Sequence, residues 1–185
     1  MHSASAYDAE VKLECGERVR IRAIRPSDKD GLLHLFRALS PRSIYSRFLY
    51  PKKDVSPEQL TYFTELDFES HVALVATIER DQEEEIIGVG RYIVGEADSS
   101  LKCAEIALAV ADEHQGHGIG QALLKRLASI GVTAGIARFE ALVHRNDSAL
   151  LRLFEHSGFA VDERTDFGRV QVVLDLKGSR VRLAD

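Results

Sequence analysis

The sequence of 185 residues has no tryptophan, one methionine, four prolines and only two cysteines. The cysteines, Cys15 and Cys103, fit a reducing compartment, because Cys103 lies in an apolar run as a buried small hydrophobe would. No apolar run approaches the length of a membrane-spanning helix. The first ten residues lack the basic region and the apolar stretch of a signal peptide. We therefore expect a soluble, cytoplasmic protein with no membrane partner.

The charge composition lacks a basic excess. Lysine and arginine number 24 against 29 aspartates and glutamates, and the formal net charge is -5. This balance argues against a nucleic-acid partner, which a basic patch would favour. The sequence contains no internal repeat and no low-complexity tract. Its length is sufficient for a buried core. We predict a polar, flexible leader over residues 1–16 and a single domain over residues 17–178.

Hydrophobic periodicity predicts strands and helices in a mixed order. Strand-like runs cover residues 19–24, 71–79, 86–94, 103–110, 137–143 and 169–176. A Ser-Pro pair, typical of an N-cap and a first helical residue, opens helical runs at Ser40 and Ser56. Further helices are predicted over residues 31–39, 120–132 and 146–158. This order predicts a mixed α/β sheet with helices on its faces.

The segment HQGHGIGQALLKRL, from His114 to Leu127, places Gly116, Gly118 and Gly120 at the start of an amphipathic helix. The first turn of a helix exposes unpaired N–H groups and the positive end of the helix dipole. Glycines there remove side-chain bulk, so that a phosphate or pyrophosphate can approach these amides. The alternative, a flexible loop that leads into a helix without any ligand, stays open from the spacing alone.

Two other glycine-rich phosphate-binding motifs and a metal site do not fit this segment. A P-loop requires Gly-x4-Gly-Lys-Ser/Thr, which the sequence does not contain. The dinucleotide fingerprint Gly-x-Gly-x-x-Gly fails in both registers, because its third glycine would fall on Gln121 or Leu123. His114 and His117 lie three residues apart, but no third ligand has the spacing of a known metal site. We therefore expect no metal, and we expect His117 to line the phosphate-binding loop.

The run VADEHQGHGIG, from Val110 to Gly120, resembles motif A of the GNAT superfamily of N-acetyltransferases, in which Gln/Arg-x-x-Gly-x-Gly/Ala follows a strand. Residues 20–28 look like the opening strand of that family, and ALLRLFEHSGF looks like its motif B. The segments LSPRSIYSRFLYPKK, SPEQLTYFTELDFESHVALVA, IIGVGRYIV and AEIALAV are similar to the Pat-type protein lysine acetyltransferase domain. The resemblance implies a GNAT-like α/β (α+β) fold: a mixed, mostly antiparallel sheet of six to seven strands with helices on both faces.

The resemblance also implies a site for acetyl-CoA as co-substrate. In the family, the loop amides hold the coenzyme A pyrophosphate, and the pantetheine arm lies in a wedge beside the preceding strand. The residues implied are Leu108, Ala109, Val110, Gln115, Gly116, His117, Gly118, Ile119, Gly120, Gln121 and Asn146. The asparagine position is open, because counting back from Gly158 places it on Asp147, and either residue can instead be a helix cap.

Acetyl transfer to an amine needs a base for the amine proton and donors for the oxyanion. Strand alternation places Glu105 on one face with Cys103, Ala107 and Ala109. Small apolar neighbours would desolvate this carboxylate, which would raise the pKa of Glu105 toward neutrality. A glutamate near solvent, or one paired with an arginine, is the alternative. The Pat-type resemblance implies Glu105 as general base and a backbone N–H at or next to Val110 as oxyanion donor.

Many relatives carry a tyrosine four residues before the final glycine of motif B, able to protonate the leaving thiolate. Here that residue is Phe154, which we expect to pack in the core. Together these residues predict an acetyl-CoA-dependent N-acetyltransferase that acetylates a primary amine by direct attack, with a protein lysine favoured by the resemblance. A small-molecule amine acetyltransferase and a non-catalytic acyl-CoA-sensing module are the alternatives.

Overall fold

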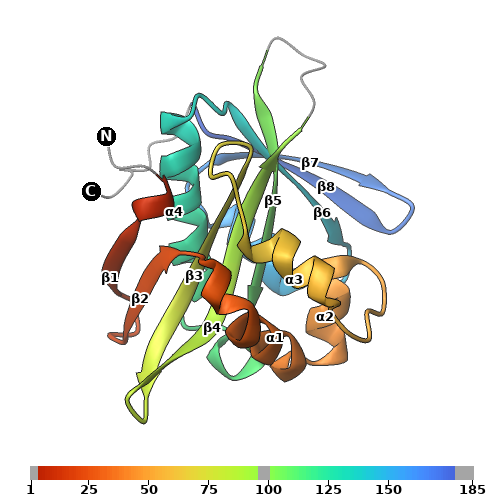
Figure 1. The fold of residues 1–185 in the computed structure, drawn as a ribbon. Coiled ribbons are helices and arrows are strands. Elements are labelled where there is room, and N and C mark those ends of the chain that lie inside the picture. Colours follow the sequence, from red (N-terminus) through yellow and green to blue (C-terminus); the bar gives the residue numbers. More distant parts are fainter. Residues whose placement is uncertain (1–3, 96–100, 178–185) are drawn as a thin grey trace.

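The computed structural model describes residues 4–95 and 101–177, which form one sheet with helices on both faces (Figure 1). The strands are β1 (Asp8–Lys12), β2 (Arg18–Ala23), β3 (His71–Arg80), β4 (Glu83–Val94), β5 (Cys103–Val110), β6 (Arg138–His144), β7 (Ala160–Asp166) and β8 (Arg169–Asp175). The helices are α1 (Lys29–Ala38), α2 (Pro41–Phe48), α3 (Pro57–Thr64), α4 (Ile119–Thr133) and α5 (Ser148–Glu155). The predicted fold class is therefore confirmed.

The strands follow the order β1-β2-β3-β4-β5-β6-β8-β7 across the sheet. Every neighbouring pair is antiparallel except β5 and β6, which are parallel because α4 connects them. That parallel pairing is short: it joins Cys103 to Arg138, Ala104 to Phe139 and Glu105 to Glu140. Beyond Glu105 the two strands separate, so the middle of the sheet opens at this point.

Two apolar clusters lie on the two faces of the sheet. One gathers side chains of α1 and α3 over β3 and β4, and includes Leu35, Leu60 and Val75. The other packs α4 and α5 against the opposite face, and includes Leu123 and Phe154. Since side chains alternate along a strand, Ala104, Ile106 and Leu108 of β5 join the cluster beneath α4 and α5, and Ala109 packs on the opposite cluster.

Two of the helix starts follow the sequence prediction. Ser40 is the N-cap of α2 and its hydroxyl accepts a hydrogen bond from Ser43 N–H. Ser56 is the N-cap of α3, where Gln59 completes a capping box. In both helices the proline takes the first helical position, where its missing N–H is not needed.

The sheet has eight strands rather than the six to seven predicted. The N-terminal segment expected as a flexible leader contains β1, which pairs with β2, and its Val11 is buried although the surrounding side chains are polar. The second additional strand, β7, exposes nearly all of its side chains, so it carries no alternating pattern in sequence. Residues 1–3 of the leader and residue 178, the predicted end of the domain, lie outside the described residues.

The described helices include none that is both long enough and apolar enough to span a membrane.

Candidate active site

The separation of β5 from β6 leaves backbone groups at the end of β5 facing an open edge. On the opposite edge, Ala111 N–H donates to the Ile87 carbonyl oxygen at 2.9 Å. Because backbone groups alternate along a strand, the N–H and the carbonyl of Val110 point the other way, toward the opening. The Val110 carbonyl accepts a hydrogen bond from the Gln115 side chain at 3.0 Å. The Val110 N–H faces the same edge, as does the N–H of Leu108 two residues earlier.

The three glycines of the loop after β5 serve two different physical purposes. Gly116 and Gly118 have φ values of 80° and 93°, a left-handed conformation that disfavours any side chain. Gly118 is the N-cap of α4, so this conformation turns the loop directly into the helix. Gly120 instead lies inside α4, where a Cβ atom would come within 2.6 Å of Leu153 Cδ1 on α5. The loop conformation and the contact between two helices thus depend on separate glycines.

A cavity of about 750 Å³ lies at the start of α4, between α2 and α5. Its size is within the range of small-molecule and cofactor sites. Among the residues implied by the resemblance, those that line it are Leu108, Ala109, Val110, Gln115, Gly116, Gly118, Ile119, Gly120 and Gln121. The N–H groups in the first turn of this 15-residue helix adjoin the cavity, where they can donate to an anion.

Helix α2 is tied to both walls of this cavity. At the end of β5, Asp112 accepts hydrogen bonds from the hydroxyls of Ser40 at 2.7 Å and Ser43 at 2.9 Å. On the other side, the Ser46 hydroxyl donates to the Asp147 carboxylate at the start of α5. The three serines are spaced three residues apart, so they share one face of the helix.

Two of the implied cofactor contacts do not line the cavity. His117 directs its Nδ1 toward Glu17, at 3.2 Å from the carboxylate, and its side chain does not line this cavity. Asn146 is exposed and outside the lining, whereas Asp147 lines it and caps α5 by accepting from Leu150 N–H at 3.1 Å. Asp147, the residue that counting back from Gly158 indicated for the asparagine position, therefore lines the cavity and is also the N-cap of α5.

Two exposed cations line the cavity and were missed in the sequence. Arg42 is on α2 and Arg152 is on α5, on the two sides of the glycine loop. A guanidinium at this position is suited to bidentate contact with a phosphate. Neither arginine is close to motif A in sequence, so only the folded arrangement brings them to it.

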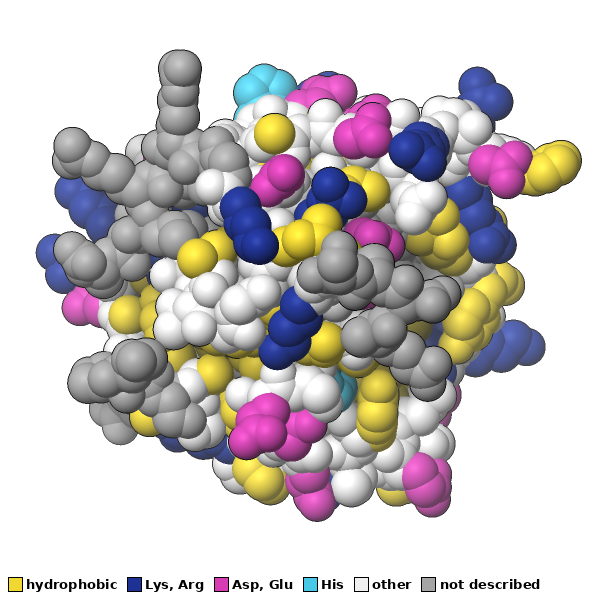
Figure 2. Space-filling view, turned by 90° about the horizontal axis from the view of Figure 1, so that it is seen from above, with side chains coloured by type: hydrophobic (Ala, Val, Ile, Leu, Met, Phe, Trp, Pro, Cys, Tyr) yellow, Lys and Arg dark blue, Asp and Glu magenta, His cyan; other side chains and the backbone are white. Residues whose placement is uncertain are grey.

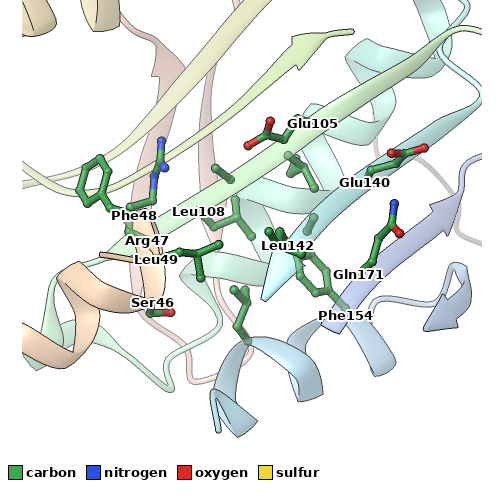
Figure 3. A pocket seen from close by; sticks show the side chains of 14 residues that line it. Ser46, Arg47, Phe48, Leu49, Glu105, Leu108, Glu140, Leu142, Phe154 and Gln171 are labelled. Atoms are coloured by element: carbon green, nitrogen blue, oxygen red, sulfur yellow. The ribbon is translucent and has the colours of Figure 1, made fainter. Parts of the chain in front are cut away.

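A second cavity, of about 420 Å³, adjoins the first where β5 and β6 separate. The two cavities share Ser46, Leu108 and Leu150 in their linings. Figure 3 shows Glu105 on β5, Glu140 on β6 and Gln171 on β8 along the strands that line this second cavity, with Arg47 on α2. A ligand that extends along the end of β5 can therefore pass from the glycine loop to Glu105.

Glu105 lies at the point where the two strands separate, on the face that alternation predicts. Its side chain is exposed, so the predicted desolvation of this carboxylate by small neighbours is wrong. The reason is that Glu105 is in the last residue pair between β5 and β6, and the open cavity begins beside it. Burial lowers the pKa of the half-buried Arg47 guanidinium, and the charge of Glu105 opposes that effect.

Glu140 is a second carboxylate in this cavity and was missed in the sequence. It is the residue of β6 paired with Glu105, so both side chains start from the same face of the sheet. In Figure 3 its side chain points away from Glu105. Phe154 also lines the cavity and is 1% exposed, which confirms the prediction that it packs in the core.

The described residues contain no group of three or more histidine, cysteine, aspartate or glutamate side chains placed to hold a metal ion. His114 lies beside Glu113, at 3.4 Å. The face of the molecule in Figure 2 carries acidic and basic side chains side by side with hydrophobic ones between them. Over the coloured part of this face, charge of neither sign predominates.

Comparison with known proteins identifies a family model that matches well over half of the chain. The model describes the Acetyltransferase (GNAT) family and matches residues 38–159. This range includes the glycine loop, Glu105 and the residues of α2 and α5 that line the two cavities.

Individual relatives extend the match over most of the chain. An acetyltransferase of Pseudomonas aeruginosa is 27% identical over 87% of this chain and 84% of its own length. Acetyltransferase Pat of Mycolicibacterium smegmatis is 28% identical over 90% of this chain and 48% of its own length. The crystal structure of the GNAT domain of S. lividans PAT is 32% identical, with a TM-score of 0.82 over 91% of this chain and 96% of that chain. The similarity to Pat-type domains therefore holds in both sequence and structure.

Proposed function

Because this chain belongs to the Acetyltransferase (GNAT) family, we propose that it transfers the acetyl group of acetyl-CoA to a primary amine, with a protein lysine as acceptor. The observation that supports this most directly is the junction of the two cavities. One adjoins the glycine loop and the start of α4, the other contains Glu105, and they meet at Leu108, three residues beyond the last pair between β5 and β6.

The first cavity has the donors that coenzyme A requires. The amides of the glycine loop and of the first turn of α4 bind the pyrophosphate, and the positive end of the helix dipole favours its charge. Arg42 and Arg152 add cations that can contact the phosphates. The pantetheine arm then follows the open edge of β5 toward Val110 and Leu108, and brings the thioester to the junction of the cavities.

The chemistry follows from the groups at that junction. Glu105 takes the proton from the acceptor ammonium, directly or through water, so that the neutral amine attacks the thioester carbonyl. The Val110 N–H on the open edge donates to the oxyanion of the tetrahedral intermediate. The new C–N bond forms and the C–S bond breaks, and coenzyme A leaves as the thiolate. Phe154 has no proton to give, so the thiolate departs unprotonated or takes a proton from water.

A lysine acceptor is supported by the similarity to Pat-type domains and by the openness of the second cavity, which a long side chain can enter from a protein surface. Glu105 and Glu140 both favour a cationic acceptor in this cavity. A small-molecule amine acetyltransferase is the alternative within the same chemistry. An acyl-CoA-sensing module without turnover is the alternative outside it.

Release of the coenzyme A thiol tests the proposal. The protein is incubated with acetyl-CoA and lysine peptides, and acetyl-lysine is identified by mass spectrometry. Glu105→Gln should lower turnover by roughly 10²–10⁴-fold, the usual contribution of a general base, while acetyl-CoA binds with unchanged affinity. Glu140→Gln is the matched control, because it makes the same change on the paired residue of the neighbouring strand.

The outcomes separate the alternatives. Equal losses in Glu105→Gln and Glu140→Gln would indicate that the cavity's negative charge matters and would contradict a specific base. Turnover of small amines without any peptide would favour the small-molecule enzyme. Binding of acetyl-CoA without thiol release from any amine would favour the sensing module.

A further inference from the structure

Charge in the second cavity is divided between its two sides. The strand side carries the carboxylates of Glu105 and Glu140, whereas the α2 side carries the guanidinium of Arg47 (Figure 3). The Arg47 side chain stacks over the Phe48 ring, with its central carbon 4.9 Å from the ring centroid. An amine acceptor accounts for the carboxylates but gives no role to a cation at the same site.

A second guanidinium lies behind Arg47 and is almost completely buried. Arg91 on β4 is 4% exposed, stacks on Phe63 at 4.5 Å, and places Nη1 3.2 Å from His71 Nε2. Its Nε is buried with no hydrogen-bond partner among the described residues. Desolvation, and then the charge of Arg47, lower the pKa of Arg91 to about 9, so it is still a cation at pH 7.

Neither guanidinium is within ion-pair distance of a carboxylate in the described part of the chain. Burial has the larger effect on the pKa of Arg47 and lowers it, and the charge of Glu105 raises it only through space. Both arginines line a small apolar cavity of about 40 Å³ between α1, α3 and the sheet. Arg47 also lines the cavity that holds Glu105, so it connects the buried charge of Arg91 to the acceptor side.

The positive charge extends along the chain around Arg47. Residues 41–53 contain Arg42, Arg47, Lys52 and Lys53 and no acidic residue, in a chain whose net charge is -5. Arg42 lines the cavity at the glycine loop, where phosphates would neutralise it. Arg47 and Arg91 do not line that cavity, so coenzyme A phosphates at the glycine loop do not account for them.

A buried cation without a counter-ion is costly, and an anion supplied by a ligand removes that cost. We propose that the acceptor carries a carboxylate beside its amine: the amine reaches Glu105, and the carboxylate binds the Arg47 guanidinium, with the positive charge of Arg91 behind it. This inference rests on the proposed function and narrows its substrate class. The carboxylate comes from an acidic residue next to the acceptor lysine in a protein, or from a free amino acid.

Two matched pairs of acceptors test whether a carboxylate beside the amine improves acetylation. The first pair is a lysine peptide with glutamate beside the lysine and the same peptide with glutamine there. The second pair is free lysine and lysinamide, which distinguishes an amino acid from a protein segment. In the wild type, kcat/KM should be about tenfold higher or more for the carboxylate member of one pair, the scale of a charge-assisted hydrogen bond.

The variants assign this preference to Arg47. Arg47→Gln should reduce the ratio between the two members of the pair to about one, and Arg47→Lys should retain part of it because the charge remains. Lys53→Gln makes the same change of charge at an exposed position that lines none of these cavities, and should leave the ratio unchanged. Thermal denaturation and acetyl-CoA binding of Arg47→Gln establish that the variant is folded.

Equal kcat/KM for both members of both pairs in the wild type would overturn the inference, as would an unchanged ratio in Arg47→Gln. The same peptide pairs are also bound to Glu105→Gln with coenzyme A present, so that affinity is measured without turnover. Carboxylate-dependent binding that needs Arg47, without turnover in the wild type, would contradict the proposed function and support this site. Turnover with no carboxylate preference would support the proposed function and contradict this carboxylate site.

Discussion

The Ser46 hydroxyl on α2 donates a hydrogen bond to the carboxylate of Asp147, the N-cap of α5. These residues are 101 positions apart in sequence, and they join the two helices on opposite walls of the cavity at the glycine loop. Asp147 also accepts from Leu150 N–H at 3.1 Å, so one carboxylate both caps α5 and holds α2. The width of the cavity thus depends on a side chain that also stabilises a helix end.

Separate substitutions distinguish these two roles of Asp147. Ser46→Ala should lower the free energy of unfolding by about 1 kcal/mol, the net value of one partly buried hydrogen bond. Asp147→Ala should lower it by about 2 kcal/mol, because it also removes a helix cap. Urea denaturation measures both. In the Asp147→Ala background, Ser46→Ala should have almost no further effect; a fully additive double variant would show that the two side chains act independently.

The left-handed conformation of Gly118 can be tested against a matched glycine. Gly118 and Gly135 have φ values of 93° and 80°, and a Cβ at either would meet no atom within 4 Å. Alanine at either position should therefore cost about 1 kcal/mol in stability, from backbone strain alone. Only Gly118 lies at the cavity, so only Gly118→Ala should weaken acetyl-CoA binding in isothermal titration calorimetry. Equal losses of affinity in both variants would contradict a role for the loop amides.

Local sequence patterns were sufficient to predict where β5 and the glycine loop of this candidate site lie. Alternation along residues 103–110 placed Glu105 and Leu108 on opposite faces, and the structure has Leu108 buried and Glu105 exposed. The glycine loop was evident because its residues are contiguous. Exposure of Glu105 was not predictable, since it depends on how far the pairing between β5 and β6 extends, and that length is a property of the whole sheet.

Other parts of the site depend on contacts between distant segments. Arg42, Arg152 and Glu140 carry no local signal, because an exposed charge on a helix or strand has the same pattern whether or not it faces a cavity. Strand β1 was missed for a related reason: in DAEVK only Val11 is buried, so pairing with β2 rather than hydrophobicity determines the strand. The direction of the His117 side chain likewise depends on Glu17, far away in sequence.

Removal of one partner from the buried ion pair between Arg22 and Asp28 should strongly destabilise the protein. The Arg22 and Asp28 side chains are 3% and 8% exposed and lie 2.8 Å apart, and Glu84 adds a third contact to Arg22 at 2.7 Å. Desolvation opposes the charge of Arg22, but hydrogen bonds to Asp28 and Glu84 raise its pKa above the usual value. Asp28→Asn should therefore lower the free energy of unfolding by about 3 kcal/mol, because it leaves a buried cation partly unpaired.

Glu84→Gln is the control for this pair. Glu84 is 34% exposed, so water can compensate for the lost charge and the expected loss is about 1 kcal/mol. Chemical denaturation at constant pH compares the two variants. A greater loss in Glu84→Gln than in Asp28→Asn would show that Glu84, rather than Asp28, is the main counter-ion of Arg22.

Because His71 stays neutral in the folded chain, the free energy of unfolding should depend on pH between 6.5 and about 4. Desolvation, with the charge of Arg91 adding to it, lowers the pKa of His71 to about 4; Asp67 opposes this shift and Arg47 adds weakly. The Tyr62 ring packs beside the imidazole at 5.2 Å. Between pH 6.5 and 4 the unfolded chain therefore binds a proton at this residue that the folded chain does not, and stability falls as pH falls.

The expected loss between pH 7 and pH 5 is about 2 kcal/mol, from a pKa of 6.5 in the unfolded chain and about 4 in the folded one. Urea denaturation at the two pH values measures it. Asp67 does not interfere, because the Ser70 hydroxyl and the backbone N–H groups hold its pKa at about 2. His71→Gln keeps an acceptor for Arg91 and retains every other histidine, so its stability should change much less over this range. An identical pH dependence in the wild type and in His71→Gln would show that the imidazole titrates as freely in the folded chain as in the unfolded one.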